Sequence, residues 1–341
     1  MAQVMDIGVD LGTASVVIYG KNKGIVLDEP AVIAFDRESR AVLAVGHEAY
    51  RMLGRTPSNV VAMRPLRNGN IEDFAMATAM LNYFVQQVVG KRLFLGGPRV
   101  VLSLPAGVNE VERQSITASL FSAGARRTHL MERPVAAAIG AGLPVGDTYG
   151  SMIVDIGGGM TEIAVISKGR CVLRDSVKIA GDKLDDAIIK YIRLKHNMLI
   201  GEMTAEDLKV NIGSALQLPE QLYMEVTGRN LISGLPKVLR VTSDEVTEAI
   251  EGPLEELMEA IHAVLEQTPA ELAADIFDNG IVLTGGGAHL SMLSQAVSKT
   301  LKIDCRLAEN AHECVARGCG LTLENWSEYG RFIGKRGQTR K

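Results

Sequence analysis

The stretch Ile7-Gly8-Val9-Asp10-Leu11-Gly12-Thr13 places an aspartate in an apolar run that leads into a glycine turn. A second stretch of the same kind reads Met152-Ile153-Val154-Asp155-Ile156-Gly157-Gly158-Gly159. Each predicts a β-hairpin whose turn leaves backbone N–H groups free to hold phosphate oxygens, beside a carboxylate that suits a hydrated cation. Two such half-sites facing each other would hold a nucleotide triphosphate between two domains.

A third glycine turn, Thr284-Gly285-Gly286-Gly287-Ala288, follows a third apolar run at Ile281-Val282-Leu283. It is expected to complete the pocket. One such turn is weak evidence for phosphate binding, but three in this order, each at the end of a predicted strand, are strong evidence.

Composition limits the function classes. The 341 residues are 47% hydrophobic and 22% charged, which is ordinary for a globular chain long enough for two domains. The net charge of −4 argues against a general nucleic-acid binder, so no nucleic-acid partner is expected. No apolar run approaches the roughly 20 residues that span a bilayer. Asp6 and Asp10 interrupt any signal-peptide pattern, and a cytoplasmic protein is expected.

The chain has four cysteines, Cys171, Cys305, Cys314 and Cys319, and no CxxC pair. They are interpreted as reduced and mostly buried thiols. The alternative is a zinc site that combines His312 with Cys314 and Cys319, although this spacing fits no common ligand pattern.

The same order of elements is predicted twice. Five short β-type runs occupy residues 5–10, 15–20, 24–27, 31–35 and 41–45, followed by a helix over 71–89 and a strand over 99–104. Asn109 and Glu112 form a capping-box-like helix start, and the next helix carries three alanines that permit close packing, Ala136-Ala137-Ala138. After Gly150 come strands over 151–155 and 161–166 with more β structure to about 179, a helix over 182–199, and a helix from Asp244 broken or kinked at Gly252-Pro253. Duplicated α/β halves around a cleft are therefore expected.

These features resemble the actin-like ATPase superfamily, and most closely its MreB/Mbl family. The resemblance covers Asp6 to about Leu323 and is carried by several stretches specific to that family. They are Gly24–Leu27, Met52–Pro57, Arg64–Arg67, Glu110–Arg113, Ala136–Leu143, Ala180–Asp182, Gly234–Lys237 and Glu271–Ile276. It implies an α/β actin-like fold of two duplicated lobes with a ribonuclease-H-like core. The implied subdomains are IA (1–32, 66–145 and 315–341), IB (33–65), IIA (146–181 and 245–314) and IIB (182–244).

The resemblance also implies ATP and Mg²⁺ as cofactors and assigns residues to them. Asp10 and Asp155 would hold Mg²⁺ through water, since this ion keeps most of its hydration shell. The first phosphate loop would be Gly12, Thr13 and Ala14, the second Gly157, Gly158 and Gly159, and the nucleoside side Gly285, Gly286, Gly287 and Ala288. Glu206 and Lys209, three apart on one helix face, would meet the ribose and adenine.

Two positions depart from the family pattern. Arg133 stands in Met131-Glu132-Arg133-Pro134 where relatives have a glutamate that activates the attacking water, and Met160 stands where relatives have a threonine that helps to place it. An arginine cannot accept a proton at neutral pH. Strongly impaired hydrolysis is therefore expected, with compensation by Glu132 and Thr161, or a slow but ordinary turnover, as the alternatives.

The resemblance further implies membrane-associated filaments at the inner face of the cell membrane that direct cell shape, together with cell-wall elongation proteins. Leu93 and Phe94, beside Lys91 and Arg92, would insert into lipid. A partly buried loop is the alternative. The basic tail from Arg331 to Lys341 is expected to be a solvated end.

Two other functions remain open at this stage. One is a non-polymerising or co-assembling regulator of a sibling filament, which the lost catalytic groups permit. The other is a small-molecule phosphotransferase, as among the sugar kinases of the superfamily, although the sequence offers no candidate base for a substrate.

Overall fold

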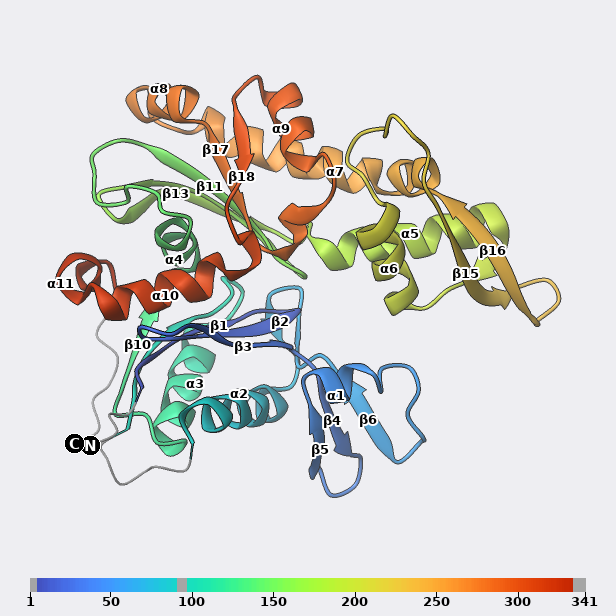
Figure 1. The fold of residues 1–341 in the computed structure, drawn as a ribbon, viewed down its shortest axis with the longest axis horizontal. Coiled ribbons are helices and arrows are strands. Elements are labelled where there is room, and N and C mark those ends of the chain that lie inside the picture. The colour runs from blue at the N-terminus through green and yellow to red at the C-terminus, as the bar shows by residue number, and fades with distance from the viewer. Residues whose placement is uncertain (1–4, 91–96, 334–341) are drawn as a thin grey trace.

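The computed structural model describes residues 5–90 and 97–333. Two five-stranded mixed sheets lie one above the other in Figure 1, and two smaller parts extend from them toward the same side. Leu93 and Phe94 lie outside the described residues, as does most of the basic tail. Within those described ranges, no helix combines the length and apolar character needed to cross a bilayer.

The first sheet has the strand order β10-β9-β1-β2-β3. Three strands run as an antiparallel meander, and β9 and β10 join them parallel to β1. The strands are β1 (Ile7–Leu11), β2 (Ser15–Gly20), β3 (Gly24–Pro30), β9 (Arg99–Ser103) and β10 (Arg127–Met131). Helices α2 (Phe74–Val89) and α3 (Glu110–Ser122) lie along one face (Figure 1), where β1, β9 and α2 share an apolar core.

The second sheet repeats this pattern in the order β13-β12-β11-β17-β18. Again three strands form an antiparallel meander, and two later strands join parallel to the first of them. The strands are β11 (Ser151–Ile156), β12 (Thr161–Ser167), β13 (Arg170–Val177), β17 (Ile281–Thr284) and β18 (Cys305–Leu307). The predicted duplication is therefore present at the level of strand order and direction.

Two short helices that contact each other through small residues separate the sheets. They are α4 (Arg133–Gly140) and α10 (Cys314–Glu324), and their core includes Val101 of the first sheet and Ile153 of the second. A Cβ atom at Gly318 would lie 1.8 Å from the Ala136 carbonyl oxygen, and one at Gly140 would lie 1.8 Å from the Cys314 carbonyl oxygen. The two backbones therefore touch, as the alanine run predicts, and this contact holds the two sheets at a fixed spacing.

Two smaller parts flank the sheets on one side of the molecule. The first is a sheet of β4 (Ile33–Asp36), β5 (Val42–Val45) and β6 (Val60–Met63) with helix α1 (His47–Tyr50). The second joins β14 (Met198–Leu199), β15 (Tyr223–Asn230) and β16 (Pro236–Thr242) to helices α5 (Gly181–His196) and α6 (Glu202–Ile212). Arg64 and Asp182 link the two parts at 2.7 Å. The predicted subdomain limits stay a prediction.

The remaining elements are short strands and turns together with four further helices, of which α7 has 24 residues and packs in the core. They are β7 (Leu66–Arg67), β8 (Asn70–Ile71), α7 (Ser243–Glu266), α8 (Ala270–Asn279), α9 (Leu293–Leu301) and α11 (Trp326–Tyr329), with 3₁₀ turns at Gly286–His289, Ala311–Glu313 and Gly330–Phe332. The helix predicted over 71–89 begins later, at Phe74, because Asp73 caps it by accepting a bond from the Met76 amide at 3.1 Å. The capping box of Asn109 and Glu112 is confirmed.

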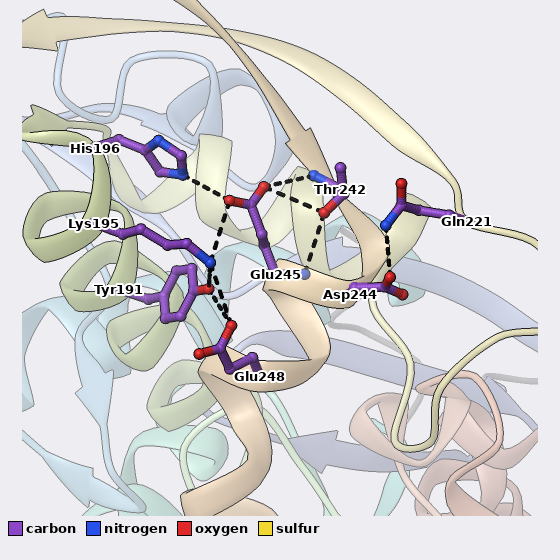
Figure 2. A network of polar contacts seen from close by, with 8 residues as sticks. All are labelled: Tyr191, Lys195, His196, Gln221, Thr242, Asp244, Glu245 and Glu248. Carbon is purple, nitrogen blue, oxygen red and sulfur yellow. Dashed lines mark hydrogen bonds and ion pairs between the residues drawn. The ribbon is translucent and has the colours of Figure 1, made fainter.

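The predicted break at Gly252-Pro253 in the helix from Asp244 is wrong, whereas the kink that was its alternative stays a prediction. Helix α7 is a single helix of 24 residues with Pro253 inside it. It begins at a capping box in which Thr242 and Glu245 exchange bonds of 3.0 and 3.3 Å, and Glu245 also contacts His196 of α5 at 2.8 Å (Figure 2). Buried residues on both sides of the proline, Ile250 and Leu254, lie in one core, so tertiary packing outweighs the hydrogen bond that Pro253 cannot donate.

Candidate functional site

The first two glycine turns have the same local geometry. The Gly12 amide donates to the Ser15 carbonyl at 3.0 Å, and the Gly157 amide donates to the Met160 carbonyl, also at 3.0 Å. Asp10 and Asp155 precede these turns at equivalent places on β1 and β11, opposite Ser103 and Thr284 of the parallel neighbours. The duplicated sheets thus bring one carboxylate and one glycine turn each to a common edge.

The two turns lie directly against each other. A Cβ atom at Gly158 would lie 2.5 Å from the Cβ of Ala14, and one at Gly159 would lie 2.7 Å from the methyl group of Thr13. Side chains at these glycines would therefore collide with the opposite turn. The absence of side chains lets the backbones of both turns approach one space.

Four amides of these turns point to no acceptor within the described part of the chain. They are the N–H groups of Thr13, Ala14, Gly158 and Gly159. Backbone donors normally find a partner, and consecutive free amides in a turn form a concave anion-binding site. This arrangement suits phosphate oxygens.

The third turn completes one wall of the same space. Gly285 has a φ of 85°, and a Cβ there would lie 2.3 Å from the Ile156 carbonyl oxygen. Gly287 packs beside Gly157 and Ile156. Only glycine allows the third turn to rest on the second in this way.

Together these turns border a cleft of about 500 Å³. Eleven of the twelve predicted binding residues line it, and so does Asp10, whereas Ala288 and Asp155 are buried behind the lining. The predicted binding residues in the lining are Gly12, Thr13, Ala14, Gly157, Gly158, Gly159, Glu206, Lys209, Gly285, Gly286 and Gly287. Arg133 and Met160, the two residues that depart from the family pattern, also line the cleft. The volume is within the range of small-molecule sites, and the cleft lies between parts of the chain far apart in sequence.

Arg133 joins the two carboxylates across the cleft. Its Nε donates to Asp155 Oδ2 at 2.7 Å, its Nη2 donates to Asp10 Oδ2 at 3.1 Å, and its Nη1 donates to Asp10 Oδ1. The arginine side chain is 12% exposed and both aspartates are buried. Burial lowers the pKa of Arg133, but the two carboxylates outweigh it and raise that pKa above its ordinary value. The group is a permanent cation at the centre of the site.

The aspartates as placed do not fit the predicted Mg²⁺. All four of their carboxylate oxygens already accept a hydrogen bond, because the Thr284 hydroxyl donates to Asp155 Oδ1 at 3.0 Å. A divalent cation between them would also meet the guanidinium. Nor does the described part of the chain contain a cluster of three or more histidine, cysteine or acidic side chains suited to a metal ion. The assignment of Asp10 and Asp155 to Mg²⁺ stays a prediction.

Glu206 and Lys209 lie on α6 at one side of the cleft, each with protein partners. Glu206 accepts a bond from the Tyr50 hydroxyl at 2.9 Å, and Lys209 donates to Asp185 at 2.8 Å and to the Gly181 carbonyl at 3.1 Å. Tyr50 belongs to α1, on the far side of the cleft. The contact closes the cleft at this end, and the role of the pair toward ribose and adenine stays a prediction.

Glu132 and Thr161, the two predicted substitutes for the groups that activate and place water, do not line the cleft. Glu132 is half exposed and lies 3.8 Å from Arg174, outside the cleft lining. Thr161 is buried, and its hydroxyl donates to the Ile179 carbonyl at 2.5 Å. Met160 does line the cleft. The geometry thus gives the compensation alternative no support.

The sequence reasoning missed Glu162, a buried carboxyl group that lines the cleft. It stands opposite Asp155 on the neighbouring strand β12, and its Oε1 accepts a bond from the Ala106 amide at 3.1 Å. Burial raises the pKa of Glu162 to about 7, an effect that Arg133 opposes. A lone glutamate in the apolar run Thr161–Ser167 was the signal that could have revealed it.

The stability of the nucleotide-free protein should fall with rising pH because of Glu162. The folded protein holds this proton up to a pKa of about 7, whereas an ordinary glutamate releases it near 4.5. The contribution is therefore complete below pH 4.5 and lost as the pH rises to 7, by about 3 kcal/mol relative to Glu162→Gln. Urea unfolding of both proteins across this range measures the difference. Parallel pH curves would contradict it.

Three more residues of the cleft lining, His312, Asp28 and Arg64, were not predicted as cleft residues, because their contact partners are distant in sequence. His312 contacts Asp28 at 3.1 Å, and this hydrogen bond raises the pKa of the histidine. Arg64 contacts Asp182 at 2.7 Å. His312 does not form the alternative zinc site, since Cys314 and Cys319 are buried in α10 and the Cys314 thiol lies against the Glu309 and Asn310 carbonyls.

Comparison with known proteins gives consistent matches. A family model described as MreB/Mbl protein matches residues 4–331. The chain is 48% identical over 324 residues to the cell shape-determining protein MreB of Escherichia coli (strain K12), covering 94% of this chain and 93% of that one. It is 46% identical over 320 residues to the cell shape-determining protein Mbl of Bacillus subtilis (strain 168), covering 94% and 96%.

Solved structures agree with this. The crystal structure of MreB5 of Spiroplasma citri bound to AMPPNP superimposes with a TM-score of 0.90 at 33% identity, covering 97% of this chain and 99% of that one, and its ADP complex has the same values. The MamK double helical filament gives a TM-score of 0.79 at 19% identity, covering 94% and 99%, and shows a shared fold only. The fold that the resemblance implied is confirmed.

Proposed function

This chain belongs to the MreB/Mbl family of actin-like proteins, and on that premise we propose that it binds ATP and assembles into filaments that direct cell shape and cell-wall elongation. The observation that carries nucleotide binding is the pair of abutting glycine turns with four free amides at the cleft. The nucleotide in the MreB5 complexes and the cell-shape roles of the relatives support the same reading.

Calorimetry with ATP tests binding, and sedimentation of the full chain with ATP tests assembly. We expect saturable binding and a polymer that pellets. A protein that binds ATP without pelleting would be the regulator of a sibling filament. Absence of ATP binding would overturn the proposal as a whole.

We propose in addition that hydrolysis is strongly impaired. The residue at the water-activating position is a cation committed to Asp10 and Asp155, and a thioether lines the cleft at the second position. Neither group accepts a proton, and positioned acid–base help is worth roughly 10²–10⁴-fold in rate. Filaments of this chain would accordingly turn over slowly.

Arg133→Glu combined with Met160→Thr is expected to raise phosphate release at least about tenfold, because it introduces a carboxylate and a hydroxyl at the two positions. The assay contains Mg²⁺, since the exchange removes the guanidinium from the two aspartates. Arg174→Gln, at an exposed arginine outside the cleft lining, is the control and should leave the low rate unchanged. An unchanged double variant would show that the catalytic positions are misplaced.

The membrane-peripheral location remains a proposal drawn from Leu93 and Phe94 in the sequence. Two large apolar side chains that pass from water into lipid gain a few kcal/mol, at about 25 cal/mol per Å² of buried surface. Filaments formed with ATP are expected to float with anionic liposomes, and Leu93→Ser with Phe94→Ser to lose at least about tenfold in the floated fraction, because avidity multiplies weak single contacts. Flotation that persists in the double variant would exclude this segment as the anchor.

A further inference from the structure

The cleft contains a built-in cation where two buried carboxylates converge. The guanidinium of Arg133 contacts Asp10 with two nitrogens and Asp155 with the third. It comes from the first turn of α4, and the aspartates come from β1 and β11, so three elements fix its position. Asp10 is 3% exposed and Asp155 is 1% exposed, so an unpaired charge there would be costly.

The same guanidinium borders the phosphate-binding turns. Its Nη2 lies 4.0 Å from the position that a Cβ at Gly12 would occupy, and Arg133 lines the cleft. A guanidinium has five N–H donors, and the three contacts described use three of them. One N–H on each terminal nitrogen remains for an oxygen placed by the turns.

Arg133 also reduces the negative charge that a phosphate group would meet in the cleft. Asp10 and Asp155 contribute two negative charges, and Arg133 offsets one. Arginine stays charged throughout the accessible pH range and forms bidentate contacts with both carboxylate and phosphate. A phosphate group at the free amides would therefore meet the remaining N–H donors of a cation without any added ion, and that cation offsets one of the two carboxylate charges.

We propose that Arg133 serves as the cation of the nucleotide site, so that this chain binds nucleotide triphosphate without requiring a divalent metal ion. The inference rests on the proposed binding of ATP and concerns how the same site neutralises the phosphates. It follows from the mismatch between the donor set and Mg²⁺, because the arginine occupies the carboxylates on which such an ion would depend.

The test is calorimetric titration of the full chain with ATP, once with excess Mg²⁺ and once with EDTA at the same ionic strength. The two dissociation constants are expected to agree within about threefold. Binding that weakens at least about tenfold in EDTA overturns the inference while leaving the proposed function intact. Failure to bind ATP under both conditions instead overturns the proposed function.

Two variants locate the effect. Arg133→Gln should bind ATP at least about tenfold more weakly in EDTA than the parent, with Mg²⁺ restoring part of the loss, because the charged hydrogen bonds from the guanidinium are removed. Arg174→Gln is the matched control, since this exposed arginine pairs with Glu132 beside the start of α4. It should remain as insensitive to EDTA as the parent. If Arg133→Gln does not fold, the comparison of the parent in Mg²⁺ and EDTA still decides. An Arg133→Gln variant that binds in EDTA as tightly as the parent contradicts the inference.

Discussion

Arg133→Met is expected to lower the free energy of unfolding of the nucleotide-free protein by about 3–5 kcal/mol, the usual cost of removing one partner from a buried ion pair. The substitution keeps the volume and apolar stem but leaves Asp10 and Asp155 without a counter-charge. Glu162 lies opposite Asp155, so removal of the guanidinium leaves three neighbouring acidic groups without a cation between them. Urea unfolding at pH 8 and 25 °C measures the change.

Arg174→Met is the control for this prediction. Arg174 is 67% exposed and lies 3.8 Å from Glu132, the residue directly before Arg133. Exposed pairs contribute about 0–1 kcal/mol, so this variant should unfold nearly as the parent does. Equal effects of the two substitutions would mean that the buried pairs in the cleft do not stabilise the fold.

Gly318→Ala should destabilise the protein by about 3 kcal/mol, near the upper end of the usual cost of overpacking. The added methyl group would lie 1.8 Å from the Ala136 carbonyl oxygen, and a backbone atom cannot turn aside as a side chain does. Helices α4 and α10 would have to separate, and the two sheets rest on them. Thermal and urea unfolding measure the loss.

Gly252→Ala is the matched control, because it makes the same change within a helix. Gly252 lies in α7, and a Cβ there would meet nothing within 4 Å. Alanine should stabilise the protein at this position by about 0.5–1 kcal/mol through its higher helix propensity. A loss of stability at Gly252, or none at Gly318, would show that the contact between α4 and α10 is not what limits substitution.

The elements of the two sheets were predictable because their signals are local. Apolar alternation and glycine turns identify β1, β2, β11 and β12 without knowledge of their partners. The capping box at Asn109 is likewise contained within four residues. The helix from Asp244 was predicted correctly, but the break in it was not, because Pro253 is a local signal for a break, whereas the packing of both halves of α7 in one core involves distant residues.

The turns of the cleft were predictable for the same reason, and the partners of the charged residues were not. A glycine turn that follows an apolar strand pattern predicts free backbone amides from a few consecutive residues. In contrast, Tyr50 with Glu206 and His312 with Asp28 are pairs more than 150 residues apart. The sequence around each of these residues gives no indication of its contact partner.

The sequence by itself determined that two similar α/β halves each carry an aspartate and a glycine turn, since those patterns lie within stretches of fewer than ten residues. It also identified Arg133 as a departure from its family. Only the tertiary structure decided what that arginine contacts, because its charge is paired with Asp10, 123 residues away, and with Asp155 on the other sheet. A charge takes its role from the charges around it, and folding alone brings these three together.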